Sequence, residues 1–415
     1  MVENRLLPQF EPYKGLEYKS AKGNHIQIVD TTSGKEYKLL DLNSGYWCCI
    51  LGHINPEIMK IFESGYYANP FGFSNPHAKE YAEKLLKLTN HSSVVFSTSG
   101  SEAADIAIRL AWQSNADGNL CKKDKKYIIS IERSYHGSTG IGLYVGGYSY
   151  DRHLPLVSEN TSNHFSIKIP SPAKFKGDIQ AFLEKRIRGL EERIAGIIFE
   201  SVMGAAGGIP LPDNYLEAFA NLSKKYGILL IADEVATGFG RTGKMFGYEH
   251  YGIQPDIICL GKGVTNGDFP FAVTLMNENV RQGIEHSQNK EVGKYTYGHT
   301  LSAHPTGCMI ALKVLEIIER NGLISEVEQK GEYTMERLAP IKDLKAVRAI
   351  QGKGLFIGVE LPSSSLAEIV QKEMMEREIF IKPEGRFIMV VPPYTITRGG
   401  IDYFAKNLEE VLKAL

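Results

Sequence analysis

The sequence predicts an α/β protein built on a mostly parallel sheet, and two observations support this prediction. From about residue 90 onward, short apolar runs alternate with longer stretches of helical periodicity. The apolar runs lack the alternation of polar and apolar residues that a half-exposed strand would show, so we expect strands buried on both faces. Buried strands that alternate with helices are typical of a parallel sheet in an α/β domain.

The elements follow from this pattern in chain order. The strands predicted for the sheet are 94–97, 127–131, 196–200, 228–233, 256–261 and 271–276. Two helices are predicted between them, at 101–115 and 215–227. Each is longer than the apolar runs and has the spacing of an amphipathic helix.

The two ends of the chain differ from this central region. Residues 25–43 carry a short two-strand pattern, and the region 304–415 is rich in helix with strands at 355–361 and 387–393. We therefore expect a large domain over residues 50–300. A smaller α+β domain would combine residues 1–49 with residues 301–415.

The bulk composition excludes several classes of protein. The 415 residues include 47 basic and 48 acidic side chains, so there is no basic excess to indicate a nucleic-acid partner. No run of 18 apolar residues could span a membrane, and the N-terminus has no apolar stretch typical of a signal peptide. The five cysteines show no spacing typical of zinc sites or disulfide frameworks. We expect a soluble cytoplasmic protein without a metal.

Polar residues follow several of the predicted strands. Ligands of open α/β sheets bind at the carboxyl ends of the strands, so these residues can share one crevice. The stretch STSGSEAADIAIRL (97–110) leads from a strand into a helix, whose exposed N–H groups and dipole attract a phosphate. The alternative is simple capping of that helix by Ser99 or Ser101.

Two further segments supply an aromatic and a hydroxyl. In ERSYHGST (132–139), Tyr135 lies beside His136 and would form a wall against a flat ligand, or would pack within a loop. In YTYGHTLSAHPTG (295–307), Thr300 offers a hydroxyl donor in a flexible turn.

The strand ILLIAD (228–233) ends in Asp233, and a second acid, Glu234, follows directly. A buried carboxylate has a desolvation cost of several kcal/mol unless a cation compensates it. The cation would be a ring nitrogen of a ligand or, alternatively, the nearby Arg241. Lys262 follows the next strand between two glycines. A desolvated lysine there would suit Schiff-base chemistry, and the alternative is a lysine that extends outward to solvent.

Together these segments match the four requirements of one cofactor. A phosphate site, an aromatic wall, an acid for a ring nitrogen and a lysine for an aldehyde are what pyridoxal 5′-phosphate (PLP) requires.

The sequence resembles the class III (omega) aminotransferases, which are fold-type I PLP enzymes, over nearly the whole chain. The motifs that carry the resemblance are DEVATGFGRTG (233–243), LGKG (260–263), SGSEA (99–103) and YHG (135–137). The lysine follows the first acid by 29 residues, a spacing that is similar to the family's. The resemblance implies a PLP-dependent aminotransferase that works by ping-pong half-reactions, and the alternative on the same scaffold is an amino-acid racemase or an aminomutase.

The resemblance also implies roles for individual residues. Lys262 would hold the cofactor as a Schiff base and then move the substrate proton, and Asp233 would keep the ring nitrogen protonated. Val235 and Tyr135 would pack on the two faces of the ring, and Thr300 would reach the phosphate of the neighbouring subunit, which implies a homodimer. The residues expected around the cofactor are Ser99, Gly100, Ser101, Tyr135, His136, Glu200, Asp233, Val235, Lys262 and Thr300.

Departures from the family pattern concern the substrate. Ala205 stands where members that handle glutamate-like substrates often carry a second glutamate, which puts a glutamate-type gate in doubt. Ala236 follows DEV, as in the 7,8-diaminopelargonic acid aminotransferases.

The segment GYWCCILGH (45–53) is similar to the aromatic substrate wall of that subgroup and of the amine:pyruvate transaminases, so Tyr46 and Trp47 are candidates for the substrate pocket. Lys382 stands near the place of the subgroup's carboxylate-binding arginine, and Arg386 is close by. The expected substrates are an amine or amino acid and a keto acid or aldehyde.

Overall fold

The central sheet contains seven strands in the order β4-β12-β11-β10-β7-β5-β6. The computed structural model describes residues 15–70, 72–115, 125–147, 165–287 and 297–415. The strands of this sheet are β4 (Ser93–Ser97), β5 (Tyr127–Ile131), β6 (Ser166–Ile169), β7 (Ile194–Phe199), β10 (Leu229–Asp233), β11 (Ile257–Leu260) and β12 (Ala272–Met276). β12 pairs antiparallel with both β11 and β4, and the remaining pairs are parallel. The predicted fold class is confirmed.

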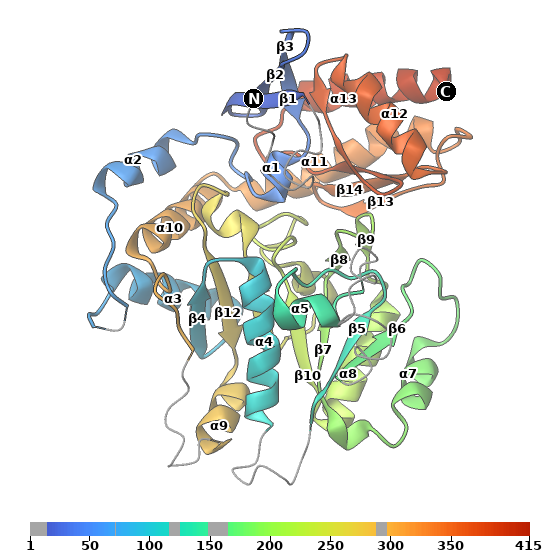
Figure 1. Cartoon of the computed structure of the whole chain (residues 1–415). Coiled ribbons are helices and arrows are strands. Elements are labelled where there is room, and N and C mark those ends of the chain that lie inside the picture. Colours follow the sequence, from blue (N-terminus) through green and yellow to red (C-terminus); the bar gives the residue numbers. More distant parts are fainter. Residues whose placement is uncertain (1–14, 71, 116–124, 148–164, 288–296) are drawn as a thin grey trace.

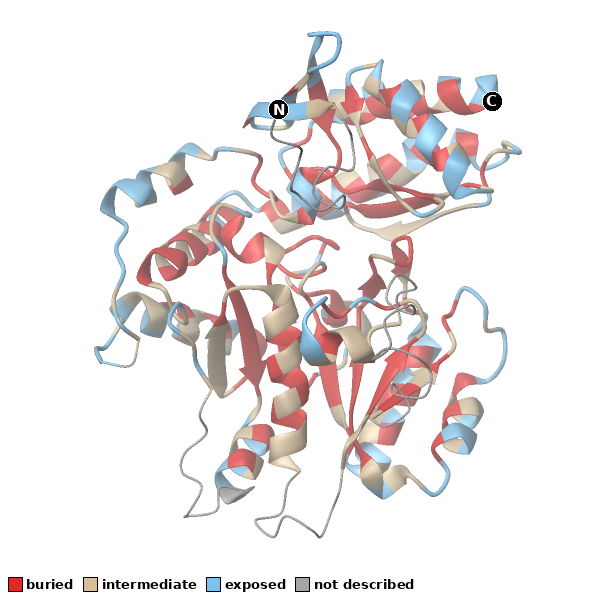
Figure 2. Cartoon of the chain, in the orientation of Figure 1, coloured by how far each residue is buried: buried red, intermediate tan, exposed pale blue. Residues whose placement is uncertain are grey.

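The sheet is buried on both faces, as the unbroken apolar runs predict. In β10, Leu230 and Ala232 belong to one core cluster and Ile231 to the other, because successive side chains of a strand point to opposite faces. Helix α4 (Gly100–Ser114) covers the face of Ile231, and α8 (Asp213–Tyr226) packs on the other face. Figure 2 shows the inner strands of the sheet as almost entirely buried, whereas the edge strand β4 is mostly intermediate.

Two smaller sheets lie beyond one end of the central sheet, at the top of Figure 1. The first contains β1 (Leu16–Lys22), β2 (His25–Asp30), β3 (Glu36–Asp41) and β15 (Ile379–Phe380). The second contains β13 (Ala349–Lys353), β14 (Phe356–Glu360), β17 (Phe387–Val390) and β16 (Lys382–Glu384). Because β15 pairs in parallel with β3, the first sheet joins segments from both ends of the chain.

The remaining helices surround these sheets, and a short hairpin lies beside them. The other α-helices are α1 (Ser44–Trp47), α2 (Pro56–Ser64), α3 (Pro76–Thr89), α5 (Gly140–Val145), α7 (Ile179–Ile187), α9 (Glu278–Ser287), α10 (Pro305–Arg320), α11 (Leu323–Leu338), α12 (Ser364–Met375) and α13 (Arg398–Ala414). The hairpin joins β8 (Val202–Met203) to β9 (Ile209–Pro210). We propose the division into a large domain at 50–300 and a small domain from 1–49 and 301–415, which the shared sheet of β3 and β15 supports. α10, just after this boundary, packs against α2 and α3 as well as α11.

None of the helices within the described ranges combines the length and the apolar character required to cross a bilayer.

Candidate active site

Five strands of the central sheet deliver polar residues to one cavity of about 220 Å³. The cavity lies at the carboxyl ends of β4, β5, β7, β10 and β11, which is where α/β sheets bind ligands. The predicted residues that line it are Tyr46, Trp47, Gly100, Ser101, Tyr135, His136, Glu200, Asp233, Val235 and Lys262. Ala205 and Ala236 also contribute to its wall.

Asp233, at the end of β10, is paired with a histidine from the loop after β5. Its Oδ2 lies 2.8 Å from Nδ1 of His136, and its Oδ1 accepts a hydrogen bond of 3.1 Å from the backbone N–H of Val235. Both side chains are buried, and Nε2 of His136 has no hydrogen-bond partner among the described residues. The carboxylate is therefore held from one side while it lines the cavity.

Glu200 lies directly after β7 and packs beside this pair. Its Oε1 accepts from the N–H of Tyr135 at 3.1 Å, and its Oε2 accepts from the N–H of Gly204 at 3.0 Å. Burial raises the pKa of Glu200 to about 7, against the opposing effect of His136. Glu200 therefore orders the loop that carries Tyr135.

Glu234 turns away from the cavity into the protein. Its carboxylate accepts four hydrogen bonds of 2.7–2.9 Å, from the hydroxyls of Ser201 and Thr237 and from the N–H groups of Gly247 and Tyr248. Burial raises its pKa, and these hydrogen bonds oppose the rise. Glu234 thus fixes the chain that follows β10.

Arg241 is not the partner of the acid pair. It is buried, and its Nη1 donates to the carbonyls of Leu355 at 3.2 Å and Pro392 at 2.6 Å. The guanidinium therefore connects this loop to the β14 and β17 region, and the alternative of an internal ion pair with Asp233 does not apply.

Lys262 opens the short helix η5 (Lys262–Thr265) after β11. Its φ of 44° lies in the left-handed region, which a residue with a side chain adopts at a cost of about 1–2 kcal/mol. The side chain lines the cavity instead of extending outward, and its Nζ lies 5.3 Å from the ring centre of Trp47.

The loop before α4 divides its polar groups between capping and the cavity. Ser99 caps α4: its hydroxyl accepts from the N–H of Glu102 at 3.2 Å, and the Glu102 carboxylate accepts from the N–H of Ser99 at 3.0 Å. Gly100 and Ser101 form the first turn of α4, whose N–H groups have no partner within the helix, and both line the cavity. An added Cβ at Gly100 would lie 2.6 Å from Cγ1 of Val235, so glycine allows this close approach.

An aromatic pair forms the opposite wall of the cavity. The rings of Tyr46 and Trp47 stack with centroids 5.3 Å apart and 10° between their planes. The four residues of α1 all have positive φ, from 49° at Ser44 to 73° at Trp47, so this element is a left-handed turn. Since three of the four have side chains, the turn stores backbone strain of about 1–2 kcal/mol per residue.

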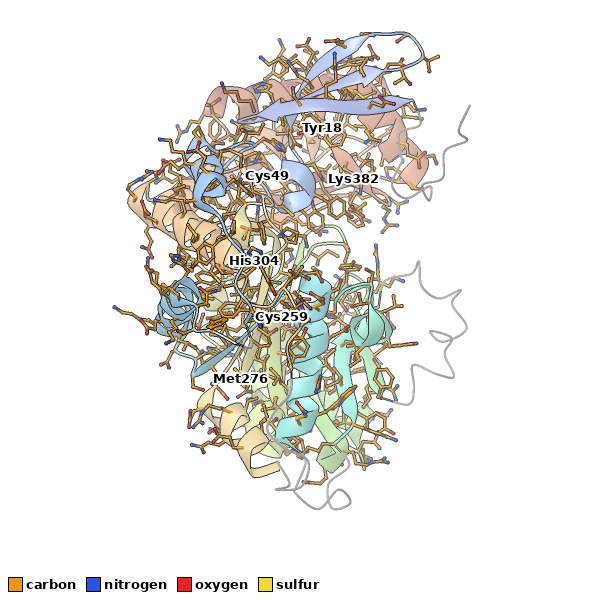
Figure 3. All side chains as sticks on the ribbon, turned by 60° about the vertical axis from the view of Figure 1, so that its left-hand side comes forward. Tyr18, Cys49, Cys259, Met276, His304 and Lys382 are labelled. Atoms are coloured by element: carbon orange, nitrogen blue, oxygen red, sulfur yellow. The ribbon has the colours of Figure 1, made fainter. Side chains whose placement is uncertain are left out.

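Four predicted residues do not line this cavity. Ser99 caps α4, and Arg386 pairs with Glu360. Lys382 places its Nζ 3.9 Å from the ring centre of Tyr46, behind the aromatic wall, and 3.7 Å from the Glu384 carboxylate. In Figure 3, Lys382 and Cys49 lie below strand β1, which carries Tyr18.

Thr300 is the fourth predicted residue that does not line the cavity. It is exposed, and its carbonyl accepts from the hydroxyl of Tyr67 at 3.2 Å.

Gly137, the last residue of the YHG motif, also lines the cavity at φ 112°, and a Cβ added there would lie 2.8 Å from the Cα of Ser101. No role was predicted for Asp41 or His53, which lie behind the aromatic wall. His53 ends the segment GYWCCILGH, but nothing in that segment indicates its contact with Asp41. Within the described ranges, no group of three His, Cys, Asp or Glu side chains is placed to hold a metal ion.

Known proteins are similar to this chain over nearly its whole length. The family model for aminotransferase class-III matches residues 11–412. The chain is 31% identical to gamma aminobutyrate transaminase 3, chloroplastic, of Solanum lycopersicum, covering 96% of this chain and 80% of that protein. It is 30% identical to adenosylmethionine-8-amino-7-oxononanoate aminotransferase of Methanocaldococcus jannaschii, covering 98% of this chain and 94% of that protein.

Solved structures give the same result. An amine transaminase from an uncultivated Pseudomonas species, in its PLP-bound form, superimposes with a TM-score of 0.87 at 30% identity and covers 100% of this chain and 97% of that chain. The chain belongs to the class III aminotransferases, a family of fold-type I enzymes that use PLP. It is a PLP-dependent aminotransferase.

Proposed function

We propose that the cavity between Lys262 and Asp233 is the site of transamination. The observation that carries this proposal is the convergence of a lysine, a histidine-paired aspartate and the first turn of α4 on one cavity. An amine, an acid and a helix N-terminus match the aldehyde, the ring nitrogen and the phosphate of PLP. The unpaired Nε2 of the buried His136 and the close packing that Gly100 allows fit a flat, polar group in this cavity.

Each of the residues that converge on the cavity then has a distinct task. When bound, PLP supplies an aldehyde for amines and a cationic ring that accepts electrons. Lys262 would hold the cofactor through its Nζ, and the same Nζ would move the substrate proton. Asp233 holds a proton on the ring nitrogen, and His136 fixes the orientation of the Asp233 carboxylate.

The remaining residues enclose the cofactor and select the substrate. Val235 and Tyr135 would pack on the two faces of the ring, and Gly100 and Ser101 would bind the phosphate. Ser99 would order this phosphate-binding turn by capping α4. Glu200 orders the loop of Tyr135. The substrate side is formed by Tyr46, Trp47 and Ala205, which favours donors with an apolar or aromatic group.

We propose that the enzyme is a homodimer in which Thr300 serves the partner's site. Thr300 is exposed and lies outside the cavity of its own chain. The neighbouring Tyr66, Tyr67 and Leu301 are exposed apolar side chains, between 43% and 52% accessible, and such patches mark interfaces.

The visible absorbance spectrum tests this function. Purified protein loaded with PLP should show the band of a lysine-bound cofactor, and adding a single amino donor without keto acid should convert that band to the pyridoxamine form. Lys262→Ala should lack the first band, while Lys225→Ala, a surface lysine, should behave as wild type. A band that persists with every donor would indicate a racemase or aminomutase instead.

The cytoplasmic location remains a prediction from the sequence. Cys48, Cys49, Cys259 and Cys308 are free in the structure, as we expect for a reducing compartment. Cell fractionation would test it.

A further inference from the structure

The left-handed turn of α1 requires an external anchor. Left-handed backbone is unfavourable for residues with side chains, so a run of it persists only where the surroundings determine it. The turn presents Tyr46 and Trp47 to the cavity, and Trp47 is buried with its ring over Lys262. Whatever holds the turn therefore sets the position of the aromatic wall.

The carboxylate of Asp41 holds the turn from inside. Asp41 is buried, and its two oxygens accept from the N–H of Asn43 at 2.7 Å and from the N–H of Gly45 at 3.0 Å. The Asn43 side chain in turn accepts from the N–H of Tyr46 at 2.9 Å. These three hydrogen bonds satisfy N–H groups within the turn and fix its path.

His53 connects the same carboxylate to the N-terminal sheet. Its Nε2 lies 2.7 Å from Oδ2 of Asp41, the oxygen that also binds Gly45. Its backbone forms an isolated bridge with Gly23, at the turn between β1 and β2, through hydrogen bonds of 2.8 and 2.9 Å. The turn is therefore attached to a rigid element outside the cavity.

We propose that Asp41 and His53 are positioning residues that set the substrate side of the cavity by locking this turn. Neither residue lines the cavity, so both act through Tyr46 and Trp47. The effect on substrate choice rests on the proposed function, in which these two rings form the substrate wall.

Tryptophan fluorescence can test the positioning directly. The chain has two tryptophans, so Trp112→Phe leaves Trp47 as the sole emitter. Trp47 is 5% exposed, and acrylamide should quench it weakly in this background. Asp41→Ala should release the turn and raise the Stern–Volmer constant of the PLP-loaded protein about threefold or more. Asp41→Asn, which keeps an acceptor oxygen, should give an intermediate value.

A matched control distinguishes this positioning role from the general effect of removing an aspartate that stabilises a turn. Asp30 also accepts two backbone N–H groups, from Thr32 at 2.8 Å and Ser33 at 3.3 Å, but it ends β2 away from the cavity. Asp30→Ala should leave the quenching of Trp47 unchanged. If Asp41→Ala does not fold, His53→Leu decides the question, because it removes the hydrogen bond between His53 and the Asp41 carboxylate and should raise the Stern–Volmer constant by a smaller factor.

Donor selectivity is the second readout. With pyruvate as acceptor, the ratio of kcat/KM for 1-phenylethylamine to that for 2-aminobutane should change about fivefold in Asp41→Ala, mainly through KM, because the aromatic wall is proposed to bind the substrate side chain and not to react. The Tyr46→Ala variant should show the same change, and the double variant no further one. Equal quenching in the folded Asp41→Ala, His53→Leu and Asp30→Ala proteins would overturn the proposal. Absence of any transamination by wild type would contradict the proposed function but not the quenching result.

Discussion

The two acids that end β10 show how adjacent residues acquire different tasks. Successive side chains of a strand point to opposite sides, so Asp233 faces the cavity and Glu234 faces the interior. Asp233 has His136 as its partner, and Glu234 has four hydrogen-bond donors. One acid thus faces the cavity, where we propose that it pairs with a cationic ligand, while the other stabilises the loop that follows.

The variant Asp233→Asn should lose most of its activity. An amide has no negative charge to hold a proton on the ring nitrogen, so the half-reaction should slow by about 1000-fold, or roughly 4 kcal/mol, and PLP should bind more weakly. Single-turnover absorbance and titration with PLP measure both effects. The matched change Glu234→Gln should instead lower the free energy of unfolding by about 1–3 kcal/mol. A mild effect of Asp233→Asn would contradict the ring-nitrogen assignment.

Glu200 should make stability depend on pH. Its pKa is raised from 4.5 to about 7 by burial, so the folded protein keeps a proton that the unfolded chain releases. In this window the folded state binds more protons, and its stability should fall as the pH rises from 4.5 to 7, by at most about 3 kcal/mol. Glu200→Gln lacks this titration. We expect urea unfolding of the cofactor-free wild type and Glu200→Gln to give plots of the free energy of unfolding against pH that diverge between pH 4.5 and 7. Parallel plots would refute the raised pKa of Glu200.

At the scale of elements, the contact between α4 and the loop after β10 depends on Gly100. The Cβ of an alanine would lie 2.6 Å from Val235, so Gly100→Ala should displace Val235 and the first turn of α4. Overpacking of this kind costs about 1–3 kcal/mol, and we expect PLP affinity to fall about tenfold. Gly399→Ala is the control, because it lies in the first turn of α13 with its nearest atom at 3.8 Å. Equal PLP affinity in both variants would show that this packing is unimportant.

The elements that the sequence predicts correctly are those with a strong local pattern. The six apolar runs after residue 90 all form strands of the central sheet. Strand β6 escaped prediction because Lys168 interrupts its apolar run. That lysine is accommodated by the carbonyl of Gly146 at 2.7 Å and the hydroxyl of Ser130 at 2.9 Å, and burial lowers its pKa to about 7. Only the tertiary structure provides these partners.

The candidate site was predictable to a similar extent. Residues at strand ends, such as Lys262 and Asp233, carry local signals because a charge after an apolar run is unusual. Asp41 carries no such signal, and the segment that ends in His53 does not indicate the contact of His53 with Asp41, because the importance of both residues comes from the left-handed turn between them. The antiparallel direction of β12 could not be predicted either, because an apolar run that is buried on both faces does not indicate the direction of the strand.

At the scale of the whole molecule, the cavity combines distant parts of the chain. The central sheet supplies the residues proposed to bind the cofactor, and the segment after β3 supplies the aromatic wall. β3 pairs with β15, and the N–H of Val391, just after β17, donates to the carbonyl of Leu42 at 2.8 Å. The position of the wall therefore depends on both ends of the chain, and the proposed dimer would add a further chain to the site.

Mixed dimers should reveal whether Thr300 acts across the interface. Thr300→Ala should weaken PLP binding by about 1.5–3 kcal/mol, the worth of one hydrogen bond to a charged group, so its homodimers should be nearly inactive at limiting PLP. Lys262→Ala homodimers should be inactive at any PLP concentration. In a mixed dimer, one site combines the intact Lys262 of the first variant with the intact Thr300 of the second. Unfolding and refolding the two together should therefore restore activity at limiting PLP, as measured by pyruvate-dependent transamination. If the mixture stays as inactive as its components although sedimentation shows dimers, Thr300 does not serve the partner's site.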